Sequence, residues 1–246
     1  MFDNYKEFEE IVKKRNGENE IESDEIDFTP TNAILINYYF GCKKWDDDLK
    51  IIRLPKSKEK QQDMNFVDNI LGCLNEKYGG SFVLRHIFSE LTYNVHEHAF
   101  DDNSDTVACI ALKEFSNEEM LEICIADYGL SIPGKFDNSN VKFSNDCNAI
   151  EKAINNFSTA SENPYERGNG LWTTIRLIIE GNEGEMLIIS RKGLLYINQS
   201  DYEYRLLDAE KMFNGTMISI RLNKNEVQNI YDLIELPKKN FYRYEG

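Results

Sequence analysis

The sequence predicts an α+β fold in which helices pack on one face of a β-sheet. One observation is the order of the elements: a strong amphipathic helix, two hairpin strands, a long polar segment, a second helix and then several short strands. Strands that cluster in this way, rather than alternating with helices, do not predict a doubly wound sheet. The other is that 41% of the 246 residues are apolar, which is enough to fill a core. We therefore expect a two-layer α/β sandwich on a mixed sheet, preceded by a small N-terminal extension.

The N-terminal extension has the pattern of a helix followed by a strand-helix-strand unit. Apolar side chains recur at helical spacing in the first fifteen residues, and the later strand pattern ends with LKIIRLP at 49–55. A polar run at 56–63 then indicates a linker. We expect the extension to cover residues 1–62 and a larger domain to cover 63–246.

The larger domain contains the clearest helix of the chain. Apolar side chains recur every three or four residues over 81–99, and Ser81 is placed to cap this helix. The polar segment 128–168 is long enough to be functional, with one helix near 148–157. The other expected elements are strands at 105–112, 120–127, 184–190, 194–198, 202–207 and 216–222, and helices at 63–77, 171–180 and after 223.

The charge balance argues against several classes of partner. Lys and Arg number 28 and Asp and Glu number 43, so the formal net charge is −15. A surface this acidic is poorly suited to nucleic-acid phosphates and is repelled by anionic membranes. No apolar run approaches the ~20 residues of a membrane span, and the acidic N-terminus lacks the features of a signal peptide. We expect a cytoplasmic protein with no nucleic-acid or membrane partner.

The cysteines predict buried reduced thiols rather than a metal site. Their number is five, and no two of them form a CxxC pair. The histidines are His86, His96 and His98, and their spacing relative to the cysteines does not fit zinc.

One face of the 81–99 helix is polar. Glu90, Asn94 and His98 follow one another at a spacing of four, which places them on one side, one turn apart. Such a row is often only the solvated side of a helix. Its chemistry also allows the Asn94 amide to give an oxygen to Mg²⁺ and Glu90 to accept a proton from an attacking hydroxyl.

A second candidate site directly follows the expected strand 120–127. Asp127 ends this strand, and Gly129 and Ser131 come next. An acidic residue before a glycine is ordinary turn chemistry. A carboxylate fixed at a strand end can also accept a hydrogen bond from an adenine amino group.

Two glycine motifs complete the set of candidates. Arg167, Gly168, Gly170 and Leu171 belong to a run that opens the next helix, where exposed backbone N–H groups and the helix dipole favour anions. No GK[ST] follows, so this run is not a P-loop. A Gly-Thr pair that ends at Thr216 begins the last expected strand.

Together, in this order and on these elements, the four motifs resemble the nucleotide-binding boxes of the GHKL or Bergerat-fold ATPases. This superfamily includes gyrase, large heat-shock chaperones, histidine kinases and mismatch-repair ATPases, and the resemblance covers residues ~80–222. It implies a histidine-kinase-like ATP-binding domain over 63–246. Glu90 and Asn94 match the family's E-x-x-x-N pattern, which implies that Asn94 binds Mg²⁺ and that Glu90 is the general base.

The other three motifs match boxes that contact the nucleotide in this family. Asp127 and Gly129 fall in the first glycine box, whose Asp binds the adenine amino group, and Thr216 matches the Thr that supports this Asp through water. The stretch 135–167 falls where the family has a mobile ATP lid. The second glycine box, which touches the phosphates, is matched by Gly168, Gly170 and Leu171.

Within the superfamily the chain is most similar to the anti-sigma-factor serine kinases. Their N-box carries a His four residues after the Asn, as His98 does here. Two positions depart from the family. Ser131 replaces the second glycine of the first box, and Glu97 stands where histidine kinases carry a phosphate-contacting Lys, a positive charge that Arg167 could supply.

The resemblance implies a Mg²⁺- and ATP-dependent serine/threonine kinase or ATPase with a regulatory protein as partner, and it allows a homodimer. A non-catalytic switch, in which ATP controls partner binding, is the alternative. Retained Glu90 favours the enzyme, whereas Ser131 and Glu97 favour the switch. The segment 24–55 resembles part of a STAS-type domain, although it also fits a plain extension with two added strands.

Overall fold

A computed structural model describes residues 50–54, 67–68, 70–72, 74, 77–99, 108–115, 117–155, 170–235 and 242–246. The elements expected before residue 50, and with them most of the STAS-like segment, lie outside these described residues, as does most of the helix expected at 63–77.

The described residues form one seven-stranded sheet in the order β1-β2-β3-β7-β4-β5-β6, with every ladder antiparallel. The mixed sheet that we expected is therefore wrong. The reason is the position of β7, which lies between β3 and β4 and pairs antiparallel with both. The strands are β1 Lys50–Arg53, β2 Ala108–Phe115, β3 Met120–Asp127, β4 Glu185–Arg191, β5 Gly193–Ile197, β6 Tyr202–Leu206 and β7 Phe213–Asn223.

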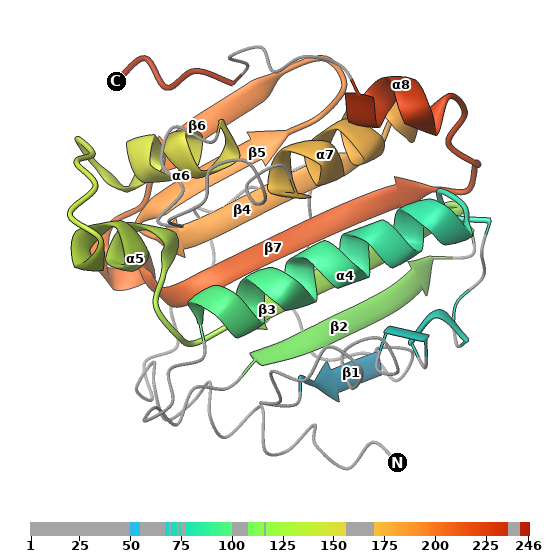
Figure 1. The fold of residues 1–246 in the computed structure, drawn as a ribbon, viewed down its shortest axis with the longest axis horizontal. Coiled ribbons are helices and arrows are strands. Elements are labelled where there is room, and N and C mark those ends of the chain that lie inside the picture. Colours follow the sequence, from blue (N-terminus) through green and yellow to red (C-terminus); the bar gives the residue numbers. More distant parts are fainter. Residues whose placement is uncertain are drawn as a thin grey trace.

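The helices α4 to α7 lie over one face of this sheet (Figure 1). The expectation of an α+β fold with helices and a sheet in separate layers is thus met by the described residues. The helices are α4 Ser81–His98, α5 Ile132–Asn138, α6 Asp146–Ile154, α7 Gly170–Arg176 and α8 Ile230–Glu235, with a π turn η1 Leu177–Gly181 after α7 and a 3-10 turn η2 Ala209–Lys211.

The core lies between α4 and the sheet because the apolar face of the helix packs there against the apolar face of the strands. In β3 every second side chain, at Leu121, Ile123 and Ile125, joins the same buried cluster as Ile87 and Leu91 of α4. Alternation in a strand and the 3.6-residue period of a helix each give one apolar face, and burying both faces against each other stabilises the layers. The expected helix at 81–99 is confirmed, but Ser81 does not cap it: Gly80 is the N-cap and no side-chain cap bond forms.

The strand expected at 49–55 is present as β1 and is the edge strand beside β2. Its register pairs Lys50 with Leu112 and Arg53 with Cys109. This part of the expected N-terminal extension therefore joins the sheet of the larger domain. No described helix is long and apolar enough to cross a membrane.

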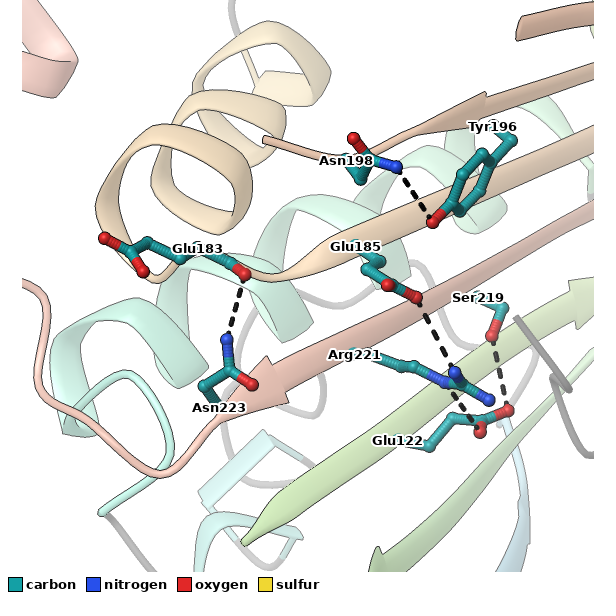
Figure 2. Close-up of polar contacts among 8 residues, drawn as sticks. All are labelled: Glu122, Glu183, Glu185, Tyr196, Asn198, Ser219, Arg221 and Asn223. Atoms are coloured by element: carbon teal, nitrogen blue, oxygen red, sulfur yellow. Dashed lines mark hydrogen bonds and ion pairs between the residues drawn. The ribbon is translucent and has the colours of Figure 1, made fainter. Parts of the chain in front are cut away.

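Charged side chains tie three central strands together on the sheet face that points away from the core (Figure 2). Arg221 of β7 forms ion pairs with Glu122 of β3 at 3.5 Å and with Glu185 of β4 at 3.6 Å. Ser219 donates a hydrogen bond of 3.4 Å to Glu122, which is 1% exposed. A buried carboxylate needs such partners, so this network fixes β3, β7 and β4 relative to one another.

Candidate functional site

Glu90 on α4 lies directly against the first residue of α7. A Cβ placed on Gly170 would come within 1.7 Å of the Glu90 Oε2 atom, so a side chain at residue 170 would require this carboxylate to move. Burial raises the pKa of Glu90 above its ordinary value. The N-box helix and the start of the second glycine box are thus brought together, with a carboxyl group of raised basicity between them.

His86, one turn before Glu90, reaches the same glycine. Burial lowers the pKa of His86, which favours the neutral imidazole, and the nearby backbone of Gly170 partly opposes this shift. Sequence analysis did not select His86, although its spacing of four from Glu90 places it on the same helix face.

Asn94 and His98 continue this face toward the end of α4. Asn94 is half-buried, which leaves part of its side chain open to solvent. The pKa of His98 is lowered, first by partial desolvation of its exposed ring and then by the positive charge of Lys135 on α5. Lys135 is a second residue that the motifs did not indicate, and it places a cation at this end of the helix.

The described residues contain no cluster of three or more His, Cys, Asp or Glu side chains that could hold a metal ion by itself. A magnesium ion at Asn94 would therefore take one amide oxygen from the protein and its other ligands from phosphate oxygens and water, which is the way Mg²⁺ is commonly bound beside nucleotides. The donor set at Asn94 is compatible with this role.

Asp127 ends β3 and is only 5% exposed. Its Oδ1 atom accepts a hydrogen bond of 2.9 Å from the backbone N–H of Gly129. Gly129 in turn packs on the end of α4, since a Cβ there would lie 2.2 Å from the carbonyl oxygen of Ala99. A side chain at residue 129 would push the turn away from the helix, so the glycine holds the Asp127 turn against α4.

Burial raises the pKa of Asp127 to about 7. Hydrogen bonds from the backbone at Gly129 and Thr216 act in the opposite direction but do not cancel the effect. Both of these hydrogen bonds are donated by the backbone, so neither comes from a cationic side chain. A buried carboxyl group in such a setting costs stability when it is ionised, which is a common property of binding sites.

Thr216 lies directly across from Asp127 in the β3–β7 ladder. The preceding Gly215 has φ of 149°, and a Cβ on it would lie 1.9 Å from the Asp127 carbonyl oxygen. The Gly-Thr pair thus lets β7 pass close to the Asp127 turn. The Thr216 hydroxyl lies 3.0 Å from the hydroxyl of Ser190 on β4.

Ser190 connects this pair to the segment that follows. Its Oγ atom accepts a hydrogen bond of 2.9 Å from the backbone N–H of Ile132, and it donates one of 3.2 Å to the carbonyl oxygen of Gly215. Ser190 is fully buried. Nothing in the local sequence around Ser190 indicates this role, because it depends on β4 and β7 being neighbours.

Ser131, the departure from the glycine box, is the N-cap of α5. Its hydroxyl accepts a hydrogen bond of 3.1 Å from the backbone N–H of Gly134, and Pro133 lies in the first turn. The sequence pattern predicted one helix in 128–168, near the position of α6, but did not predict α5. A Ser followed by Pro two residues later is a helix-start pattern that would have found it.

The candidate residues fall into two groups along α4. Glu90 and Gly170 form one group, with Leu171 half-buried next to it, and Asp127, Gly129 and Thr216 form the other near Ala99. Nine residues of helix separate Glu90 from Ala99, about 13 Å at 1.5 Å per residue, and Asn94 lies between them. Arg167 and Gly168 lie outside the described residues, as does the part of the expected lid beyond residue 155.

A scan against protein-family models returned no match, and neither did a search of curated protein sequences.

Proposed function

We propose that this chain binds ATP with Mg²⁺ along α4, between the Asp127 turn and the N-terminus of α7, as a nucleotide-binding protein of the GHKL type. We also propose that the two layers form a Bergerat sandwich. The observation that carries it is the buried Asp127 carboxyl group beside Thr216, with its pKa raised to about 7. A buried carboxyl group in this position lowers stability when it is ionised but is well suited to accept the hydrogen bond of an adenine amino group.

The proposed roles follow the order of residues along α4. Asp127 binds the adenine, and Gly129 and Thr216 lie beside its carboxyl group. Asn94 lies between the adenine end and the phosphate end, where its amide oxygen is available to a phosphate-bound Mg²⁺. The first N–H groups of α7, beside Gly170, supply hydrogen-bond donors for phosphate oxygens.

Glu90 favours an enzyme over a passive switch. Its carboxyl group lies against Gly170, at the proposed phosphate end, and burial raises its pKa. A carboxylate of raised basicity at this place can accept the proton of an attacking hydroxyl group or water. We therefore propose a protein serine/threonine kinase or ATPase that acts on or with a regulatory protein partner.

The alternative function, an ATP-gated switch without turnover, is favoured by Ser131. The Ser131 cap and the bond from Ile132 to Ser190 join α5 to the adenine end of the site. A nucleotide at Asp127 would be in a position to influence α5 through these contacts. Such coupling needs no chemical step.

Titration calorimetry with ATP, with and without Mg²⁺, tests the proposal. We expect binding that Mg²⁺ strengthens, and a loss of roughly 10- to 150-fold in affinity for Asp127→Ala, because a hydrogen bond to a charged group contributes about 1.5–3 kcal/mol. Circular dichroism controls for folding. Unchanged affinity in a folded Asp127→Ala protein would remove the adenine assignment, and radiolabelled ATP turnover with candidate partners separates the enzyme from the switch.

A further inference from the structure

Residues 242–246 pack beside β6, at the sheet edge opposite β1, and their red trace follows this edge in Figure 1. The contacts are made by two tyrosines in alternate positions, Tyr242 and Tyr244, while Arg243 between them is exposed. We refer to residues 242–246 as the tyrosine strap.

Tyr242 lies among aromatic side chains from two different elements. Its ring centre is 6.3 Å from that of Trp172 on α7 and 5.2 Å from that of Tyr202 on β6, in an edge-on arrangement with the latter. Aromatic pairs at these distances are attractive beyond their buried area. Burial raises the pKa of Tyr242 to about 12. Its φ of 54° is uncommon for a tyrosine and requires contacts that hold it.

Tyr244 contacts β6 and the start of α6. Its ring lies edge-on to that of Tyr204 at 5.4 Å, and its hydroxyl oxygen accepts a hydrogen bond of 2.8 Å from the amide of Asn145. The other end of the same amide caps α6 by accepting a 3.0 Å bond from the N–H of Asn148. The Asn145 side chain therefore forms hydrogen bonds with both α6 and the strap.

The strap backbone is held by hydroxyl groups of β6. Tyr204 donates a hydrogen bond of 2.7 Å to the carbonyl oxygen of Tyr242, and Tyr202 donates one of 3.3 Å to that of Arg243. Both bonds bind backbone carbonyl oxygens, so they do not depend on the side chains of the strap. The ring contacts and the Asn145 amide select tyrosine at the first and third positions.

We propose that this surface is a peptide-binding trough for Tyr-x-Tyr segments, which the chain's own strap occupies. The trough is formed by Asn145, Trp172, Tyr202 and Tyr204. Its components are those of peptide recognition in general, in which backbone hydrogen bonds give affinity and pockets for alternate side chains give specificity. Peptide binding in the trough does not depend on nucleotide binding, whereas its regulatory consequence rests on the proposed function.

The trough lies next to the candidate site and joins α7, which belongs to that site, to α6. Trp172 follows Gly170 by two residues on α7, and Asn145 begins α6. An occupied trough therefore holds the N-terminus of α7, and with it the Gly170 contact to Glu90, in a fixed relation to α6. An emptied trough releases this constraint, so exchange of the strap is a means of regulating the site.

The test uses the full chain with its strap released. An attached strap competes at an effective concentration near the millimolar range, which masks added peptide, so Tyr242→Ala with Tyr244→Ala empties the trough. The chain has two tryptophans, and Trp45→Phe leaves Trp172 as the only source of tryptophan emission, which is excited selectively over tyrosine. We expect red-shifted emission in the double variant and a saturable return toward the original spectrum when the peptide NFYRYEG, residues 240–246, is added.

Matched controls distinguish specific binding in the trough from nonspecific effects of a peptide or a substitution. The peptide NFARAEG lacks both rings and is expected not to restore the spectrum. Arg243→Ala changes the exposed middle side chain but keeps its carbonyl oxygen, so its emission is expected to match that of the parent chain. Failure of NFYRYEG to bind the folded double variant, or equal effects of both peptides, would overturn the proposal.

A milder variant keeps the test valid if the double variant does not fold. Tyr244→Phe removes only the hydroxyl group that Asn145 binds, and loss of one such bond weakens docking about 2- to 10-fold. Amide exchange in residues 242–246 is expected to accelerate by this factor, and an unchanged rate contradicts the assignment. If light scattering finds a dimer that dissociates when the strap is released, the strap occupies the trough of a second copy, and the assignment to the same chain is overturned.

Discussion

Replacing Asp127 by asparagine is expected to stabilise the protein at neutral pH and to have little effect in acid. Its pKa is about 7 in the folded chain and 3.8 in the reference state. The folded state therefore binds more protons than the unfolded state between these values. The free energy of unfolding contributed by this group falls as pH rises through that window and is constant above about pH 7.

The magnitude follows from the width of the window. A shift of about 3 units at 1.36 kcal/mol per unit gives about 4 kcal/mol between the lower and upper ends. Asparagine retains an oxygen that can accept the Gly129 N–H bond but has no charge to desolvate. The stability difference between Asp127→Asn and the parent chain should therefore grow with pH, by about 1.4 kcal/mol per unit below pH 7.

Urea unfolding of both proteins from about pH 5.5 to 8 measures this difference, because the other carboxyl groups contribute equally and cancel. Over this range we expect it to increase by about 2 kcal/mol. Glu118→Gln, at an exposed turn position, is the control and should change stability by less than about 0.5 kcal/mol. A difference that does not vary with pH would refute the account of Asp127 as a buried carboxyl group without a cation.

Three further results are expected. Asn94→Ala should bind ATP weakly and lose the strengthening by Mg²⁺, as measured by calorimetry, and equal magnesium dependence in both proteins would reject its role as a ligand. If the chain turns over ATP, Glu90→Gln should lower the rate about 10²- to 10⁴-fold with nearly unchanged affinity, and a mutant as fast as the parent would exclude Glu90 as the base. Ser131→Ala should cost about 0.5–2 kcal/mol of unfolding free energy through the lost α5 cap, whereas Ser139→Ala, at an exposed position, should not, and equal midpoints in urea would remove the capping role.

Local sequence patterns were sufficient for the elements that have strong periodicity. The α4 helix and strand β3 were expected within one residue of their observed bounds, because each has one continuous apolar face. The same pattern indicated that Glu90, Asn94 and His98 share a side of α4. The short helix α5 was missed because its start depends on a single serine and proline and not on a periodic apolar face.

Long-range neighbours could not be obtained from such patterns. The insertion of β7 between β3 and β4 decides that Thr216 lies beside Asp127 and that Ser190 reaches both β7 and α5. The resemblance to a known family anticipated the first of these relations through its Gly-Thr pair, but not the second. The contact of the strap with Trp172 joins segments about 70 residues apart, which no local rule of hydrophobic spacing reports.

Discrimination between ATP and inosine triphosphate tests the central claim most directly. The two nucleotides differ at the 6-position of the base, where only adenine carries the amino group that Asp127 is proposed to bind. The parent chain should prefer ATP by roughly 10- to 150-fold, and Asp127→Ala should bind both with equal, weak affinity. Equal affinities in the parent chain, or a preference for ATP that survives in folded Asp127→Ala, would contradict the account.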